Sequence, residues 1–246
     1  MSSLTGKTAL VTGGSRGIGA ATAVRLAQQG ADVAITYVQG ADAARDVVRK
    51  IEAAGQRGVA IQADAAEAGS AAAAVERTIT ELGRLDILVN NVGVGILGPL
   101  ESLTLNDADR ILDVNVRSVF LTAQAASAHL ERGGRIISIG SCMAQRVPGP
   151  GGALYATSKA ALIGLTKALA RELGGRGITA NIVHPGPIDT EMNPANGPYA
   201  EAQSAMTALG RYGSPDEVAS LVGYLAGDDA AYITGSEFSV DGGHAA

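Results

Sequence analysis

Short runs of apolar residues alternate along most of the chain with longer stretches in which apolar positions recur every three to four residues. The short runs are rich in Val, Ile and Leu, and several lack a polar face, which is typical of parallel strands covered on both sides. The strands expected from this pattern are Lys7–Val11, Asp32–Tyr37, Gly58–Gln62, Asp86–Asn90, Arg135–Ile139, Ile178–Val183 and Glu237–Val240.

The longer stretches predict helices, and glycine follows several of them, as at Gly30, Gly55 and Gly83. The helices expected are Gly17–Gln29, Ala41–Ala54, Ala68–Leu82, Leu105–Leu130, Ala153–Leu173, Ala200–Ala208 and Pro215–Ala226. Repeated strand–helix units predict an α/β fold: a doubly wound, mostly parallel, seven-stranded sheet with helices on both faces. No linker or repeat interrupts residues 1–246, so we expect a single domain, with ligands bound beyond the carboxyl ends of its strands.

Composition narrows the range of partners. The chain has 246 residues, 46% of them hydrophobic, which is enough for one large core. It carries a net charge of -5 and no basic cluster, which argues against nucleic acid as a partner. A single cysteine, Cys142, excludes an intrachain disulfide and suits a reducing compartment. Because we see neither a signal peptide nor an apolar run long enough to span a bilayer, we expect a cytoplasmic protein without a membrane partner.

A glycine-rich turn, residues 12–19 (TGGSRGIG), joins the first predicted strand to the first predicted helix. Gly13, Gly17 and Gly19 allow a sharp turn and let a pyrophosphate approach the main chain. The helix that follows offers free N–H groups and the positive end of its dipole. This context predicts a dinucleotide site, and the alternative is an ordinary turn that happens to be rich in glycine.

The end of the second strand bears on which dinucleotide binds. Sites for NAD place an acidic residue there to bind the ribose 2′-hydroxyl. Residues 34–40 read AITYVQG, with Tyr37 at the strand end, and the first acid is Asp42 in the next helix. Arg16 can pair with a 2′-phosphate, although it can also be a solvated surface arginine. Together these features favour NADP(H) over NAD(H).

A second set of residues offers acid–base chemistry. Tyr155 and Lys159 are four positions apart at the start of a predicted helix, so their side chains share one face. A nearby ammonium stabilises a phenolate and lowers its pKa, which would let Tyr155 exchange a proton with a carbonyl or an alcohol. Ser141 follows the strand Arg135–Ile139 and would lie over the same edge. Asn115 is a poor helix former inside a predicted helix. The alternatives are a surface Tyr–Lys pair and a solvent-facing asparagine.

Together these residues resemble the short-chain dehydrogenase/reductase family of the classical type, over nearly the whole chain. The motifs that carry the resemblance are residues 12–19, Asp64, residues 90–93 (NNVG), Asn115, Ser141, Tyr155 with Lys159, Pro185-Gly186 with Thr190, and residues 241–243 (DGG). Among its subgroups, the chain is similar to the 3-oxoacyl-carrier-protein reductase-like ketoreductases, on residues 171–181 and 230–235.

The resemblance implies a Rossmann fold and an NADP(H)-dependent oxidoreductase that reduces a ketone, or oxidises a secondary alcohol, by hydride transfer. It implies that Tyr155 is the general acid/base, that Lys159 lowers its pKa and binds the nicotinamide ribose, and that Ser141 orients the carbonyl. Asn115 would hold a relay water. The implied cofactor contacts are Gly13, Ser15, Arg16, Gly17, Ile18, Gly19, Tyr37, Asp64, Ala65, Asn91, Gly93, Tyr155, Lys159, Pro185, Gly186, Ile188 and Thr190.

Two departures from the family pattern concern the site. Val92 replaces the usual alanine, and the loop Met143–Leu154 makes the spacing from Ser141 to Tyr155 one residue longer, with Ser138 as a less favoured substitute for the serine. The segment Pro187–Met206 reads as a substrate lid or as a plain surface loop.

The resemblance also implies a homotetramer, with the two long helices at one interface and the last strand at another. We see no Cys/His cluster for a metal. The alternative to an enzyme is a non-catalytic, dinucleotide-binding regulatory protein on the same fold.

Overall fold

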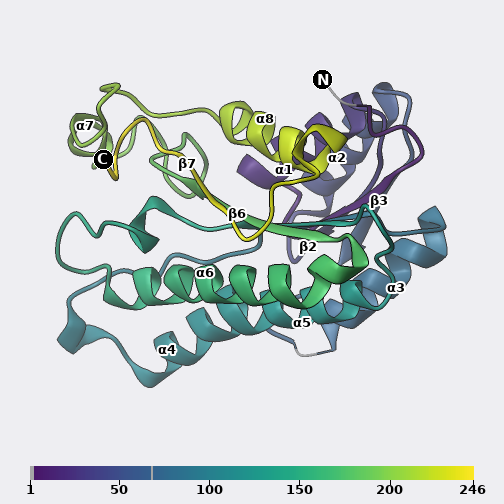
Figure 1. Ribbon diagram of the computed structural model, residues 1–246. Coiled ribbons are helices and arrows are strands. Elements are labelled where there is room, and N and C mark those ends of the chain that lie inside the picture. Colours follow the sequence, from purple (N-terminus) through teal and green to yellow (C-terminus); the bar gives the residue numbers. More distant parts are fainter. Residues whose placement is uncertain (1–2, 68) are drawn as a thin grey trace.

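The computed structural model describes residues 3–67 and 69–246, and its centre is a seven-stranded sheet in the order β3-β2-β1-β4-β5-β6-β7 (Figure 1). The strands are β1 (Thr8–Val11), β2 (Asp32–Tyr37), β3 (Gly58–Gln62), β4 (Ile87–Asn90), β5 (Arg135–Ile139), β6 (Thr179–Pro185) and β7 (Glu237–Val240). All six neighbouring pairs are parallel, which confirms the doubly wound Rossmann fold. The strand order reverses between β1 and β4, where such sheets open a crevice for ligands.

Helices cover both faces of the sheet (Figure 1). They are α1 (Gly17–Gln28), α2 (Ala41–Ala53), α3 (Ser70–Leu82), α4 (Leu105–Leu112), α5 (Ser118–Ser127), α6 (Ala153–Leu173), α7 (Ala200–Ala205) and α8 (Pro215–Ala226). Helices α1, α2 and α8 pack on one face, while α3, α4, α5 and α6 lie on the other.

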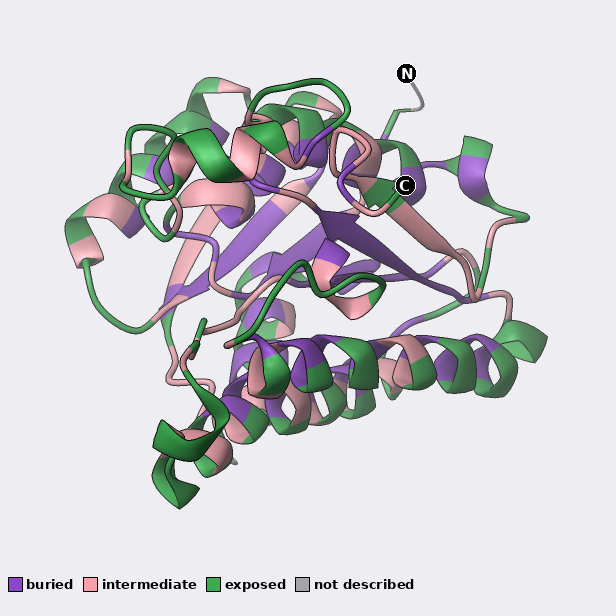
Figure 2. Cartoon of the chain, turned by 90° about the vertical axis from the view of Figure 1, so that its left-hand side faces the viewer, coloured by how far each residue is buried: buried purple, intermediate pink, exposed green. Residues whose placement is uncertain are grey.

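Alternation along the strands divides the core between these two layers, because successive side chains of a strand point to opposite faces. Val11 and Ile35 pack under the first helical layer, whereas Leu10 and Ala34, their neighbours in sequence, pack under the second. Figure 2 shows the sheet buried between helices whose outer surfaces are exposed. The strands therefore need apolar residues on both faces, which explains their continuous apolar runs.

The structure refines several predicted boundaries. The predicted helix start at Ala68 lies outside the described residues, and the helix begins at Ser70. The predicted helix Leu105–Leu130 contains a turn of π-helix at Asp113–Arg117 between α4 and α5. The start of α4 is fixed by a capping box, in which Thr104 and Asp107 each bond the other's backbone N–H.

Among the described residues, none of the helices combines the length and the apolar character that a membrane span needs. The longest of them, α6, is amphipathic by burial, with Leu162 and Thr166 in the interior and its other side exposed (Figure 2).

Candidate active site

The predicted site residues gather at the carboxyl edge of the sheet. The glycine-rich turn follows β1, residues 64 and 65 follow β3, residues 91–93 follow β4, Ser141 follows β5, and Pro185 ends β6. This placement is what the parallel topology requires, since the carboxyl ends of parallel strands meet at one edge.

The glycine turn is packed too closely for side chains at several positions. A Cβ on Gly14 would lie 2.6 Å from Ile35 Cγ2, and one on Gly19 would lie 2.4 Å from the carbonyl oxygen of Gly13. Gly13 and Gly17 have φ values of +63° and +52°, which L side chains rarely adopt. No side chain caps the start of α1, so its first N–H groups are left for a ligand.

Neighbouring strands hold this turn in place. Thr36 of β2 accepts a hydrogen bond from Gly13 N–H at 2.9 Å. Asn91 donates from its amide to the carbonyl oxygens of Thr12 and Gly13, at 3.0 Å each. The resemblance implies that Asn91 contacts the cofactor, and in the structure its side-chain amide holds the turn in place. Val92 also packs on the turn, with its Cα 3.2 Å from where a Gly13 Cβ would stand.

Arg16 lies on the exposed side of the turn. One of its guanidinium nitrogens is 2.8 Å from Glu191, and the two side chains are 53% and 70% exposed. Another guanidinium nitrogen lies 3.5 Å from where a Gly40 Cβ would stand, just beyond the end of β2. The guanidinium thus lies near the end of β2, where the sequence predicts the 2′-phosphate of NADP(H). It is also paired with the Glu191 carboxylate, which the sequence did not predict.

The adenosine end of the cleft is lined by small side chains. A small cavity lies beside the carboxyl ends of β1, β2 and β3, and its lining includes Thr12, Thr36, Ala65 and Val92. Asp64 accepts a hydrogen bond from Ala66 N–H at 2.9 Å, which orders the segment after β3. Other predicted cofactor contacts flank this end: Ser15 is buried, and Ile18 and Tyr37 are half-buried against the core.

Ser141 and Tyr155 come together in the structure. Ser141 follows β5 with an extended backbone, and its side chain lies close enough to the Tyr155 phenol to lower the pKa of that group. The longer loop between them therefore does not separate the two groups. Ser138, the less favoured substitute, lies inside β5 opposite Asn90 of β4 and is buried.

Lys159 is buried behind Tyr155. Its Nζ is 5.9 Å from the centre of the Tyr155 ring and donates to the Ile139 carbonyl oxygen at 3.0 Å. Gly93 makes room for it, because a Cβ there would lie 3.2 Å from Nζ. The predicted catalytic pair thus shares one helix face and one side of the cleft.

Asn115 is buried in the π-helical turn rather than facing solvent. Its Oδ1 accepts from Val94 N–H at 2.8 Å, and its Nδ2 donates to Val94 O and to Ser158 Oγ, both at 3.0 Å. The side-chain amide therefore connects the segment after β4 with α6. The water relay that the resemblance implies for Asn115 stays a prediction.

Burial dominates the electrostatics of these groups. It lowers the pKa of Lys159 to about 8. It also raises the pKa of Tyr155 above its ordinary value, and the hydrogen bond from Ser141 offsets this only in part. The expected lowering of the Tyr155 pKa by Lys159 is thus absent from this structure, because desolvation disfavours the phenolate more than its neighbours favour it.

The segment after β6 closes the cleft from the other side. Gly186 must be glycine, since a Cβ would lie 2.6 Å from the Cα of Asp241, and Ile188 is buried. The Thr190 methyl group lies 3.2 Å from where a Gly17 Cβ would stand. Residues far apart in the sequence therefore meet at the glycine turn, as the resemblance implies.

Other candidate chemistry near the site is weak. Cys142 is buried, and burial raises the pKa of its thiol to about 11, which disfavours a nucleophilic thiolate. Within residues 3–67 and 69–246, three or more His, Cys, Asp or Glu side chains nowhere gather in a way that could hold a metal ion.

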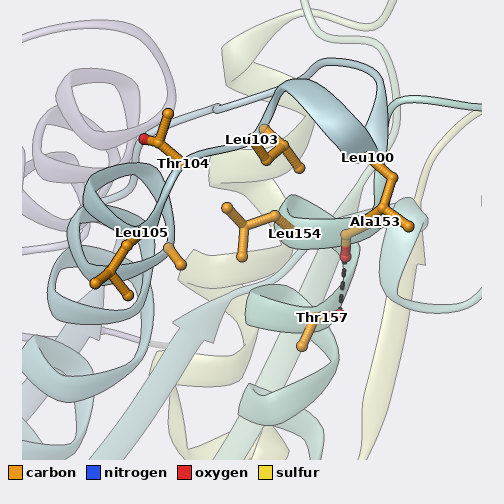
Figure 3. A pocket seen from close by; sticks show the side chains of 8 residues that line it. Leu100, Leu103, Thr104, Leu105, Ala153, Leu154 and Thr157 are labelled. Atoms are coloured by element: carbon orange, nitrogen blue, oxygen red, sulfur yellow. Dashed lines mark hydrogen bonds between the residues drawn. The ribbon is translucent and has the colours of Figure 1, made fainter.

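A cavity of about 420 Å³ lies beside the start of α6, outside the cleft (Figure 3). Its lining is Leu100, Leu103, Thr104, Leu105, Ala108, Ala153, Leu154 and Thr157. None of the predicted site residues lines it, so the mainly apolar cavity is separate from the predicted acid–base chemistry.

Sequence reasoning overlooked residues whose role depends on tertiary contacts. Thr36 accepts a hydrogen bond from the glycine turn, and Ser158 accepts one from Asn115. Glu191 pairs with Arg16, and its only sequence signal is its place beside Thr190. His184 stands two residues before Gly186 and accepts a hydrogen bond from Ser141 N–H at 3.2 Å, although the sequence suggested no link between them.

Known proteins resemble this chain over almost its whole length. A family model described as "Enoyl-(Acyl carrier protein) reductase" matches residues 13–245. A 3-oxoacyl-[acyl-carrier-protein] reductase of Synechocystis sp. is 43% identical over 99% of this chain and 98% of its own length. The cyclic-di-GMP-binding biofilm dispersal mediator protein of Escherichia coli is 42% identical over 98% of each chain.

Solved structures agree in fold as well as in sequence. A short chain dehydrogenase from Burkholderia cenocepacia, crystallised in complex with NADP, matches with a TM-score of 0.98. It is 56% identical, and the match covers 99% of each chain.

Proposed function

The chain belongs to the classical short-chain dehydrogenase/reductase family of oxidoreductases, and from that premise we propose that it reduces a ketone with NADPH, or oxidises the corresponding secondary alcohol, with Tyr155 as general acid/base. The observation that carries the proposal is the buried Lys159, whose Nζ lies 5.9 Å from the centre of the Tyr155 ring, with Ser141 close enough to this phenol to lower its pKa.

The residues of the cleft fit a phosphorylated dinucleotide. Glycines keep the turn tightly packed on its neighbours, and the N-cap residue Arg16 makes no side-chain hydrogen bond to the start of α1, which leaves N–H groups there for a pyrophosphate. The end of β2 carries no acid, and the exposed guanidinium of Arg16 lies beside it. The NADP complex of the 56% identical Burkholderia protein supports the same cofactor for this chain. When bound, the nicotinamide supplies or accepts the hydride.

The protein's own residues supply position and a proton. Ser141 would orient the carbonyl oxygen of the substrate, and the Tyr155 phenol would donate its proton to that oxygen. Because burial raises the pKa of Tyr155, the phenol stays protonated at neutral pH, which suits reduction of a ketone. Lys159, held by the Ile139 carbonyl, places a positive charge behind the phenol and would bind the nicotinamide ribose. General acid catalysis of this kind is worth about 10²- to 10⁴-fold in rate.

The proposal includes a cytoplasmic homotetramer. The helices that the resemblance assigns to one interface expose apolar side chains, namely Leu105, Leu112 and Phe120, and Leu105 also lines the apolar cavity of Figure 3. Covering these side chains would remove apolar surface from water. Light scattering of the purified protein measures the mass directly, and a Phe120→Glu variant should shift it to smaller species.

The enzymatic proposal is tested by following NADPH absorbance with a panel of carbonyl compounds. The panel includes a 3-oxoacyl thioester, a β-keto ester, a quinone and a simple ketone, each run with NADPH and with NADH. We expect turnover of at least one carbonyl with a preference for NADPH. Tight NADPH binding with no turnover on any carbonyl would instead support the non-catalytic regulatory protein.

A further inference from the structure

A buried histidine lies directly behind the serine of the site. His184, in β6, is 0% exposed, and its Nδ1 accepts a hydrogen bond from the backbone N–H of Ser141 at 3.2 Å. The other groups of the proposed mechanism do not explain why an imidazole is buried at this place.

The contact with Ser141 decides which nitrogen of the ring carries the proton. Because Nδ1 accepts, it is unprotonated, and the neutral ring must carry its proton on Nε2. That nitrogen lies 3.4 Å from the Glu237 carboxylate of β7, close enough for an electrostatic contact, although it has no hydrogen-bond partner among the described residues. The other oxygen of Glu237 lies 2.9 Å from Lys167 Nζ, which keeps the carboxylate ionised and turned toward this region.

The backbone of Gly140 packs directly against the His184 ring. A Cβ on Gly140 would lie 2.4 Å from His184 Nδ1, so only glycine lets the ring reach the amide of Ser141. Gly140 N–H bonds the Val183 carbonyl oxygen at 2.7 Å, which continues the pairing of β5 with β6 up to the imidazole. The ring thus fills the space beneath the backbone that carries Ser141.

We propose that His184, with Nδ1 accepting from Ser141 N–H and Nε2–H facing Glu237, is a positioning residue that fixes the Ser141 backbone for carbonyl binding. This inference rests on the proposed function of Ser141 and assigns a role to the residue packed behind it. A doubly protonated ring would turn Nδ1 into a donor facing the N–H donor of Ser141. The hydrogen bond would then be lost, and the hydroxyl would no longer be held against Tyr155.

Protonation of the ring depends on burial and on charged groups from two elements, α6 and β7. Burial and the Lys159 ammonium of α6 lower the pKa of His184, while the Glu237 carboxylate of β7 raises it. Asp241, at the end of the same strand, instead accepts hydrogen bonds from Gly243 and Ala245 N–H. The net direction is a pKa below 6.5, so the ring is neutral at neutral pH and activity should fall as acid protonates it.

Two variants of similar size separate positioning from packing. His184→Asn keeps an acceptor near the position of Nδ1 but cannot titrate, whereas His184→Leu offers no acceptor. We expect His184→Asn to keep kcat within about threefold of the wild type without the acidic fall in activity. His184→Leu should lower kcat on the order of tenfold, because a buried N–H is left unpaired. Thermal unfolding and NADPH affinity, measured on both variants, report whether each is folded.

A third variant tests the role of Glu237. Glu237→Gln keeps a polar side chain beside Nε2–H but removes the charge that favours the imidazolium, so the acidic fall in kcat should move to lower pH. The positioning role is overturned if folded His184→Leu has the kcat of the wild type. It is also overturned if the acidic fall in kcat occurs at the same pH in Glu237→Gln as in the wild type.

The ¹⁵N NMR signals of the His184 ring provide a readout independent of turnover. They should report a protonated Nε2 and an unprotonated Nδ1 at neutral pH, and a protonated Nδ1 would overturn the inference. Absence of carbonyl turnover by the wild type would instead count against the proposed function, so the two failures are distinguishable.

Discussion

The two ends of the cleft hold their polar groups in opposite ways. At the catalytic end, Asn115 is 0% exposed and Lys159 is 4% exposed, and each is fixed by hydrogen bonds to backbone atoms. At the cofactor end, beside the glycine turn, Arg16 and Glu191 face each other with more than half of each side chain exposed. Desolvation therefore shifts pKa values at the catalytic end, whereas water and salt screen the charges at the cofactor end.

This difference separates the kinetic effects that each end can have. Buried, fixed groups act on the chemical step, where small changes in geometry and protonation cost orders of magnitude. Exposed charges act on cofactor affinity: an exposed side-chain pair such as Arg16–Glu191 is worth about 0.2–1 kcal/mol, and an arginine–phosphate contact is worth more. Substitutions at the two ends should thus change different quantities.

The largest effect is expected for Tyr155→Phe, which removes the proton donor and keeps the ring. Carbonyl reduction should fall by about 10²- to 10⁴-fold, since general acid catalysis is lost. Steady-state kinetics with saturating NADPH measures the fall in kcat. Turnover close to the wild-type value would show that another group donates the proton.

The next largest effect is a dependence on pH set by Lys159. Its lowered pKa of about 8 means that the ammonium loses its proton as pH rises through that value, and the charge behind Tyr155 is then lost. We expect kcat for reduction to fall about tenfold per pH unit above the apparent pKa. A pH–rate profile tests this, and a flat profile up to about pH 10 would contradict it.

Arg16→Ala probes the exposed end. We expect NADPH affinity to fall on the order of tenfold and NADH affinity to stay nearly unchanged, because only the 2′-phosphate needs the guanidinium. The preference for NADPH should also weaken with added salt in the wild type but not in the variant. Equal losses for the two cofactors would place Arg16 elsewhere than at the 2′-phosphate.

The smallest effect is expected for Glu191→Gln. The variant removes the carboxylate that competes for Arg16, so NADPH should bind about two- to fivefold more tightly, in line with an exposed ion pair. Fluorescence titration of NADPH measures this, with Glu201→Gln, also exposed and close in sequence, as the matched control. Weaker binding of NADPH to the Glu191 variant would mean that the carboxylate supports the cofactor site.

The sequence predicted the fold well because the layers repeat a local pattern. Continuous apolar strands and glycine-terminated helices are local signals, and repeated strand–helix units imply a parallel sheet with right-handed crossovers. The π-helical turn at Asp113–Arg117 was missed, because it depends on how Asn115 bonds Val94 and Ser158 across the fold. No local periodicity encodes such contacts.

The site was predictable as a set of residues but not as a set of interactions. Spacing brought Tyr155 and Lys159 to one helix face, and topology brought Ser141 to them. The direction of the Tyr155 pKa came out differently, because burial raises it by more than Ser141 lowers it. Glu191 and His184 act through partners more than 40 positions away in the sequence, so their contacts became visible only in three dimensions.

If the buried catalytic end and the exposed cofactor end act separately, a catalytic variant should lose turnover and keep its affinity for NADPH. Measuring kcat and the NADPH dissociation constant on one preparation of Tyr155→Phe tests this. The account predicts a dissociation constant equal to that of the wild type, with nearly all turnover lost. Retained turnover, or a loss of turnover matched by an equal loss of NADPH affinity, would contradict it.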